Sequence, residues 1–98
     1  MKTINDWRSQ IDAIDAELLR LLNKRAQIVR EVASLKREQN APVCDPERER
    51  ELIRSLCGSN AGPLDDQAVN TIFRSIIDES RRTQTSVIDQ RPAIPGED

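Results

Sequence analysis

A single arginine interrupts the apolar pattern of the first half of the chain. Apolar residues recur there at spacings of three and four, and the position that follows Leu21 in this pattern is Arg25, before the pattern resumes at Ile28. Burying an unpaired guanidinium costs several kcal/mol, so we expect Arg25 to meet an anion. A structural ion pair, or a side chain that reaches the edge of a helical bundle, is the alternative explanation.

Polar residues also take apolar positions in two later stretches. Glu49 lies three residues before Leu52 and shares its helical face, and Ser80 lies four residues after Ile76, with Gln84 four beyond it. Each has an ordinary alternative. Glu49 could stabilise a first helical turn and pair with a nearby arginine, Ser80 could bond back to its own helix, and Gln84 could lie in a frayed end.

Three further cations lie beside these positions. Lys36 and Arg8 each follow an apolar residue of the first pattern by one position, and Arg48 stands between Asp45 and Glu49. Taken singly, Lys36 and Arg8 could be solvated, and Arg48 could simply pair with Asp45. Taken together, the cations, one acid and two neutral hydrogen-bonding groups predict a buried pocket for a small anion that also carries a hydroxyl group.

Several other kinds of chemistry do not fit the composition. The chain has no histidine, which excludes Ser/His/Asp and Cys/His nucleophilic sites and argues against zinc. We assign no function to Cys44 or Cys57, and we expect neither a metal nor a cofactor. The net charge is −2 with both signs interspersed, which argues against a nucleic-acid or membrane surface. There is no signal-peptide core and no membrane-length apolar run, so we expect a cytoplasmic protein.

Three helices are expected to position these residues, so the predicted fold class is all-α. We predict helices over about 5–39, 46–56 and 66–87, with Asp45 and Asp65 as N-caps and Gly58 ending the second. Residues 1–88 should form one domain, and 89–98, which include RPAIPGED, a disordered tail. The first helix is too long for two shorter helices to cover, so we expect an antiparallel homodimer. Its apolar seam comprises Ile4, Trp7, Ile11, Ile14, Leu18, Leu21, Ile28, Val32 and Leu35.

The spacing along the first helix limits which cations can share a ligand. Arg25 and Lys36 lie roughly 16 Å apart along the helix axis, so two long side chains can converge on one small molecule. Arg8 lies roughly 25 Å from Arg25, which is too far. If Arg8 contributes, it must come from the antiparallel partner chain, with the two-fold axis near Leu18 and Leu19.

The whole set of polar positions resembles a known family. The pattern Arg8…Arg25…Lys36…Asp45-x-x-Arg48-Glu49…Ser80-x-x-x-Gln84 is similar to that of the all-α chorismate mutases, as are the stretches IDAIDAELLRLLNKR, VCDPERERELI and IFRSIIDESRRTQ. The resemblance covers residues 4 to 88. It implies an intertwined dimer that converts chorismate, a dianion with one ring hydroxyl, to prephenate on the route to phenylalanine and tyrosine. This Claisen rearrangement needs no proton transfer and no covalent intermediate.

The resemblance also implies a role for each matched residue. Arg25 and the partner subunit's Arg8 would clamp the two carboxylates, with a hydrogen bond from Ser80. Lys36 and Gln84 would donate to the ether oxygen as it gains negative charge.

The remaining matched residues would recognise the ring hydroxyl. Glu49 would accept its hydrogen bond, helped by the backbone at Asp45. Arg48 would order the segment from Asp45 to Glu49 and border the pocket.

Two other functions remain open from the sequence. An isochorismate-pyruvate lyase would share the fold and the cationic pocket, but Asp45, Glu49 and Ser80 favour the mutase pattern. A non-catalytic dimerisation module would use the first helix as a plain seam, with Arg25 as a polar residue that sets its register.

Overall fold

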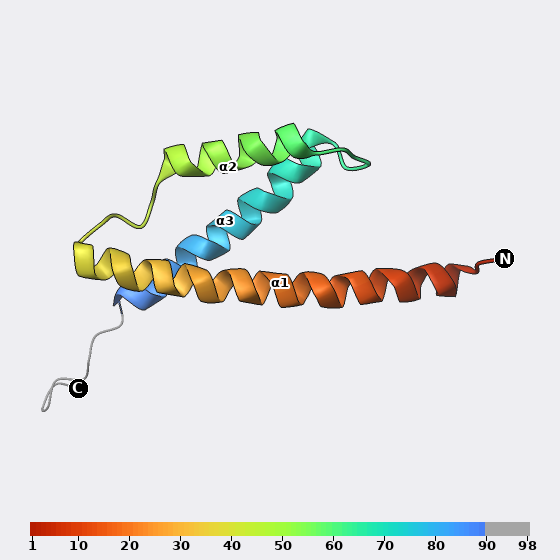
Figure 1. Ribbon diagram of the computed structural model, residues 1–98, viewed down its shortest axis with the longest axis horizontal. Coiled ribbons are helices and arrows are strands. Elements are labelled where there is room, and N and C mark those ends of the chain that lie inside the picture. Colours follow the sequence, from red (N-terminus) through yellow and green to blue (C-terminus); the bar gives the residue numbers. More distant parts are fainter. Residues whose placement is uncertain (90–98) are drawn as a thin grey trace, which may run out of the picture.

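Residues 1–89, which the computed structural model describes, form three helices in an open arrangement (Figure 1). They are α1 (Ile4–Gln39), α2 (Pro46–Ser59) and α3 (Asp66–Asp89). The all-α class and the pattern of one long and two shorter helices are therefore confirmed. The molecule measures 67 × 31 × 17 Å, because α1 extends far beyond the other two helices.

Both ends of α1 are fixed by side-chain or backbone caps. Thr3 and Asp6 form a reciprocal capping box at the start, with the Thr3 N–H donating to Asp6 Oδ2 at 2.8 Å. At the other end Asn40 adopts a left-handed conformation with φ of 54°, and the Ala41 N–H donates to the Lys36 carbonyl at 2.9 Å. This stop turns the chain away about one turn after Lys36 and leads it toward α2.

The two predicted aspartate caps are present. Asp45 Oδ1 accepts from the Arg48 N–H at 3.1 Å, with Pro46 as the first residue of α2. Asp65 Oδ1 accepts from the Ala68 N–H at 2.8 Å at the start of α3. Both caps satisfy N–H groups that have no partner within the helix.

The prediction that Gly58 ends α2 is wrong. The helix continues through Gly58 to Ser59, and Asn60 is its C-cap in an extended conformation. The Asn60 side chain fixes the next turn, because its Nδ2 donates to the Leu64 carbonyl at 2.7 Å and its Oδ1 accepts from the Gly62 N–H at 3.0 Å. A glycine inside a helix lowers its stability by only about 1 kcal/mol, which is too little to end the helix. The turn held by Asn60 therefore determines where α2 stops.

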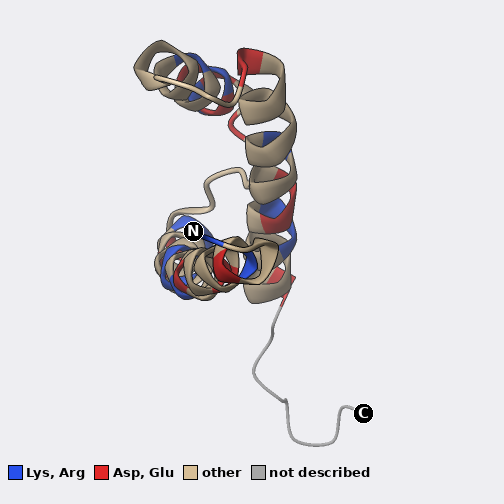
Figure 2. Ribbon diagram, turned by 90° about the vertical axis from the view of Figure 1, so that its right-hand side faces the viewer, with Lys and Arg blue, Asp and Glu red and all other residues tan. Residues whose placement is uncertain are grey.

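α3 packs against both other helices and holds the small core together. α1 and α2 lie on the same side of α3, near its two ends (Figure 2). The buried apolar residues come from all three helices: Ala33, Ile53, Val69, Ile77 and Val87. A core this small leaves most of α1 without intramolecular cover.

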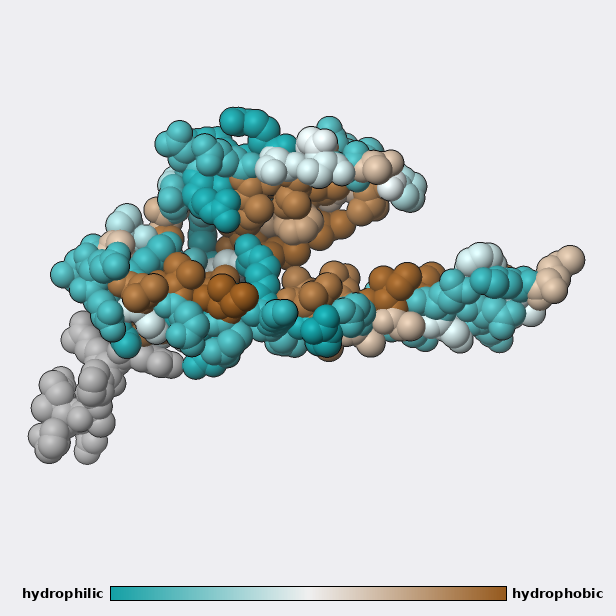
Figure 3. Space-filling model, viewed as in Figure 1, coloured by the Kyte–Doolittle hydropathy of each residue, from teal (hydrophilic) through white to brown (hydrophobic). Residues whose placement is uncertain are grey.

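The predicted seam of α1 is exposed in the single chain. Residues 1–21 are all exposed, and apolar side chains form a broken line along α1 (Figure 3). Monomeric proteins rarely expose large contiguous apolar surfaces. The exposed seam residues are Ile4, Trp7, Ile11, Ile14, Leu18, Leu21, Ile28, Val32 and Leu35.

Two expectations concern the C-terminal tail and membrane-spanning helices. α3 includes Asp89, the first residue assigned to the tail, and residues 90–98 lie outside the described part of the chain. Among residues 1–89, no helix combines the length and the apolar character that crossing a bilayer requires.

Candidate active site

A cavity of about 200 Å³ lies where the three helices meet the connection between α1 and α2. Its walls combine apolar side chains, such as Val29, Val32 and Leu52, with charged and polar ones. Seven of the eight predicted site residues line it: Arg25, Lys36, Asp45, Arg48, Glu49, Ser80 and Gln84. The structure therefore brings together residues from all three helices that the sequence marks only as polar positions within apolar patterns or as charged residues beside them.

Arg25 enters the cavity from α1 and meets a neutral partner. Its Nη1 donates to Ser80 Oγ, and the Ser80 hydroxyl in turn donates to the Ile76 carbonyl at 2.9 Å. Burial lowers the pKa of Arg25, and the nearby positive charge of Arg48 lowers it further. This wall of the cavity therefore holds positive charge that a bound anion would stabilise.

Lys36 joins α1 to the far end of α3. Its Nζ donates to Gln84 Oε1 at 2.8 Å and to the Val43 carbonyl at 3.1 Å. An ammonium has three protons, so one remains for another acceptor. Gln84 is only 9% exposed, which rules out the frayed alternative, and because its oxygen faces Lys36 its NH2 group can serve as a second donor.

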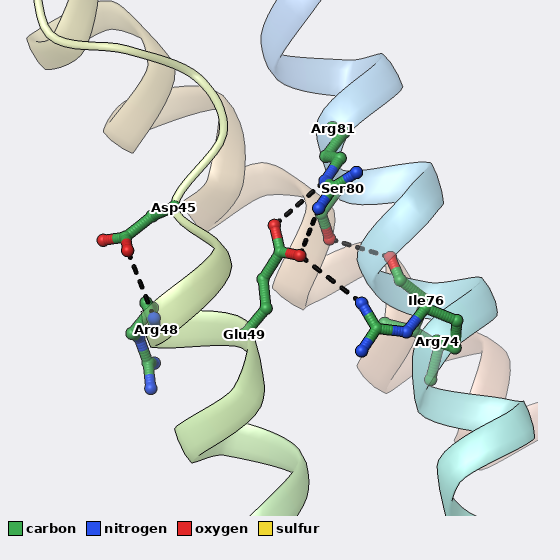
Figure 4. Close-up of polar contacts among 7 residues, drawn as sticks. All are labelled: Asp45, Arg48, Glu49, Arg74, Ile76, Ser80 and Arg81. Carbon is green, nitrogen blue, oxygen red and sulfur yellow. Dashed lines mark hydrogen bonds and ion pairs between the residues drawn. The ribbon is translucent and has the colours of Figure 1, made fainter.

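Glu49 reaches from α2 toward α3, where two arginines bind its carboxylate (Figure 4). Arg81 Nε donates to Oε2 at 2.9 Å, while Arg81 Nη2 and Arg74 Nη1 both donate to Oε1, the latter at 3.4 Å. The Glu49 side chain is only 12% exposed. The ordinary alternative for Glu49, a pair with a nearby arginine, is thus present, and the same residue also lines the cavity.

Asp45 and Arg48 form the rim of the cavity where α2 begins. The Asp45 side chain is occupied as the N-cap through the Arg48 backbone N–H. The Arg48 guanidinium remains exposed at the first turn of α2. Its charge acts on Arg25, as the lowered pKa of that residue indicates.

Arg8 lies apart from these seven residues. It is exposed on α1 and does not line the cavity of its own chain. Its distance from Arg25 along the helix axis is roughly 25 Å.

Sequence analysis missed the arginines that bind Glu49. Arg74, Ile77, Arg81 and Gln84 recur at spacings of three, four and three, and Ile77 and Gln84 are buried. This spacing places the two arginines beside a buried face of α3, so the pattern itself could have identified them.

The arrangement suits binding and electrostatic stabilisation. Cations from α1 and the rim, an acid from α2 and amide and hydroxyl groups from α3 surround a cavity with apolar walls. Donors that are already fixed in such surroundings stabilise developing negative charge without further reorganisation. Within residues 1–89, no group of three or more His, Cys, Asp or Glu side chains is placed to hold a metal ion.

Known sequences place these residues in context. Residues 7–85 match the family described as chorismate mutase type II. The chorismate mutase of Methanocaldococcus jannaschii is 30% identical over 93 residues, which cover 92% of each chain. The bifunctional chorismate mutase/prephenate dehydratase of Aquifex aeolicus is 37% identical over 81 residues, or 79% of this chain and 22% of that protein. The chain thus spans about a fifth of the length of this bifunctional relative.

Solved structures share the fold. The chorismate mutase of Thermus thermophilus (form II) has a TM-score of 0.84 and 32% identity, and the match covers 86% of this chain and 96% of that one. The Helicobacter pylori chorismate mutase, solved in complex with prephenate, has a TM-score of 0.83 and 28% identity, and the match covers 91% and 97%. Because sequence and fold both match over most of the described residues, this chain belongs to the type II chorismate mutase family.

Proposed function

We propose that this chain converts chorismate to prephenate, as a mutase serving phenylalanine and tyrosine synthesis. The observation that carries the proposal is that Arg25, Lys36, Glu49, Ser80 and Gln84, from three different helices, line the same cavity. The reaction is an intramolecular Claisen rearrangement. An enzyme accelerates it by holding the reactive conformer and stabilising charge in the transition state, and both tasks need fixed side chains rather than a nucleophile.

The carboxylates of the substrate are assigned to the arginine side of the cavity. The Arg25 guanidinium offers a planar pair of donors for one carboxylate, and Arg8 of the partner subunit binds the other. The Ser80 proton is directed to the Ile76 carbonyl in the unliganded chain, so the hydroxyl must turn before it donates to a carboxylate.

The breaking C–O bond is assigned to Lys36 and Gln84. The ether oxygen gains negative charge in the transition state, and both the remaining Lys36 proton and the Gln84 NH2 group can donate to it. The Val43 carbonyl and Gln84 Oε1 fix the ammonium before the substrate arrives. A donor of this kind is worth about 3–4 kcal/mol of the barrier, by analogy with oxyanion-hole donors.

The ring hydroxyl is assigned to Glu49 and the backbone at Asp45. Glu49 is an anion held by arginines, so it acts as an acceptor. Arg48 borders this end and, through its N–H bond to Asp45, keeps the start of α2 in place.

A second copy of the chain is part of the proposal. The exposed seam of α1 needs cover, and an antiparallel partner with its two-fold axis near Leu18 and Leu19 would bring its Arg8 toward the cavity. The assembly would be an intertwined homodimer with two sites. Cytoplasmic location also stays a proposal, resting on composition.

The direct test is to follow chorismate loss and prephenate formation with purified protein and with Lys36→Ala beside it. We expect activity in the natural chain and a loss in kcat of about 10²- to 10³-fold in the variant. Lys24→Ala, an exposed lysine on α1, is the matched control and should keep its activity. Salicylate and pyruvate from isochorismate, with chorismate untouched, would instead indicate the lyase.

A further inference from the structure

The arginines around Glu49 leave one part of its carboxylate free. Among residues 1–89, Oε1 accepts from Arg81 Nη2 and Arg74 Nη1, while Oε2 accepts from Arg81 Nε alone. A carboxylate offers about four acceptor positions, two on each oxygen. Three are occupied, and the fourth is the second lone pair of Oε2.

Arg81 dominates this arrangement. It binds both oxygens through two donors of one planar guanidinium, whereas Arg74 reaches one oxygen at 3.4 Å. Arg81 lines the cavity and Arg74 does not. The hydrogen bond to Glu49 also raises the pKa of Arg81, so its guanidinium stays charged. A paired guanidinium fixes both the position and the rotation of a carboxylate, which a single hydrogen bond does not.

We propose that Arg81 is a positioning residue that turns Glu49 so that Oε2 receives the ring hydroxyl of the substrate. This inference rests on the proposed mutase function and adds to it the residue that sets hydroxyl recognition. Arg81 acts through Glu49, because Nε and one Nη of its guanidinium are already bound to that carboxylate.

Hydroxyl recognition gives this role a measurable signature. A site built to hydrogen-bond a hydroxyl loses its advantage when the substrate lacks that group. The hydroxyl is bound both before and during the rearrangement. Loss of its hydrogen bond to Glu49 should therefore change mainly KM and affect kcat less. A purely structural role of Arg81 would affect all substrates alike.

The first experiment is a double-mutant cycle measured on chorismate. Arg81→Met should lower kcat/KM about tenfold, mainly through KM, while the same change in a Glu49→Gln background should alter it less than about twofold. Arg82→Met is the matched control, since Arg82 is the neighbouring residue, pairs with Glu79 at 2.9 Å and lies outside the cavity. It should retain the natural kcat/KM.

Two further measurements separate the possible results. With a chorismate analogue that lacks the ring hydroxyl, the natural chain and Arg81→Met should have the same KM. If Arg81→Met does not fold, Arg81→Lys provides the same comparisons, because it keeps the charge but cannot bind both oxygens. Suppose that the natural chain converts chorismate. Additive effects in the cycle, or equal losses of kcat/KM on both substrates, would then overturn the proposed role of Arg81 but not the mutase function. Failure of the natural chain to convert chorismate would overturn the mutase function and this role with it.

Discussion

At the scale of single residues, Lys36 and Gln84 are hydrogen-bonded to each other at one end of the cavity. The Gln84 oxygen accepts from the ammonium, and its NH2 group stays available to a ligand. Because the amide is neutral, it donates at any ordinary pH. In the proposed reaction, the pair would therefore stabilise the charge on the ether oxygen without depending on acid conditions.

Replacing Gln84 with glutamate should make activity depend on pH. The new carboxyl can donate only when protonated, and its ionised form would place negative charge beside the ether oxygen. Activity of Gln84→Glu should therefore fall as pH rises through the pKa of that carboxyl, while the natural chain changes little. The measurement is kcat against pH for both proteins. A flat profile in the variant would contradict the role assigned to Gln84.

Arg25 should couple ligand binding to stability. A dianion that binds the folded state raises the melting temperature, and Arg25 holds partly buried positive charge that such a ligand would stabilise. Prephenate should raise the melting temperature of the natural chain and leave that of Arg25→Leu unchanged. A non-catalytic module would respond differently, with no effect of prephenate on either protein and a more stable Arg25→Leu dimer.

Four site residues could be found from the sequence because each breaks a helical pattern that is otherwise clear: Arg25, Glu49, Ser80 and Gln84. Lys36, Asp45 and Arg48 lie beside such positions. A charge in the seam at Arg25, or an amide in phase with buried residues at Gln84, has few explanations other than a partner inside the fold. The spacing of Arg81 from the buried Ile77 and Gln84 could have placed it beside a buried face, but not its partner, since its contact with Glu49 depends on how α2 lies against α3. A contact between helices cannot be deduced from the spacing within one of them.

At the scale of elements, α3 matters most, because Ser80 and Gln84 project from it into the cavity. Its N-terminus is held by Asp65, whose side chain accepts from the Ala68 N–H. This cap lies far along the helix from both site residues.

Removing this cap should therefore affect stability and leave the site intact. Asp65→Ala should lower the free energy of unfolding by about 1 kcal/mol, with kcat and KM retained under conditions where the protein is folded. Chemical denaturation of the variant and of Asp12→Ala, an exposed control in the N-terminal third of α1, measures the difference. Equal stability of the two variants would contradict the importance of the cap.

The element boundaries could be predicted where the chain carries its own stop or start signals. Asp45 followed by Pro46 begins α2 as expected, because both residues act locally. Gly58 did not end it, because the turn held by the Asn60 side chain determines the stop. That turn involves residues on both sides of the loop, and a search for glycine alone overlooks it.

At the scale of the whole molecule, a single chain leaves a large part of its apolar surface exposed. α1 carries exposed apolar residues from Ile4 to Leu35, and the other helices cover little of this seam. The length of α1 and its apolar pattern, which only Arg25 interrupts, led to the prediction of a partner chain. The antiparallel direction of the proposed partner follows from Arg8, which lies too far from the cavity of its own chain to contribute there.

The most direct test of the account mixes two inactive variants. In the proposed dimer, each cavity combines Arg25 of one chain with Arg8 of the other. Arg8→Ala and Arg25→Ala should each be inactive, yet a mixed dimer holds one site with both arginines intact. After equal amounts are unfolded together and refolded, about a quarter of all sites should be complete, and chorismate turnover should return to that fraction. If the mixture is as inactive as its two components, Arg8 does not complete a neighbouring cavity, and the shared active site is wrong.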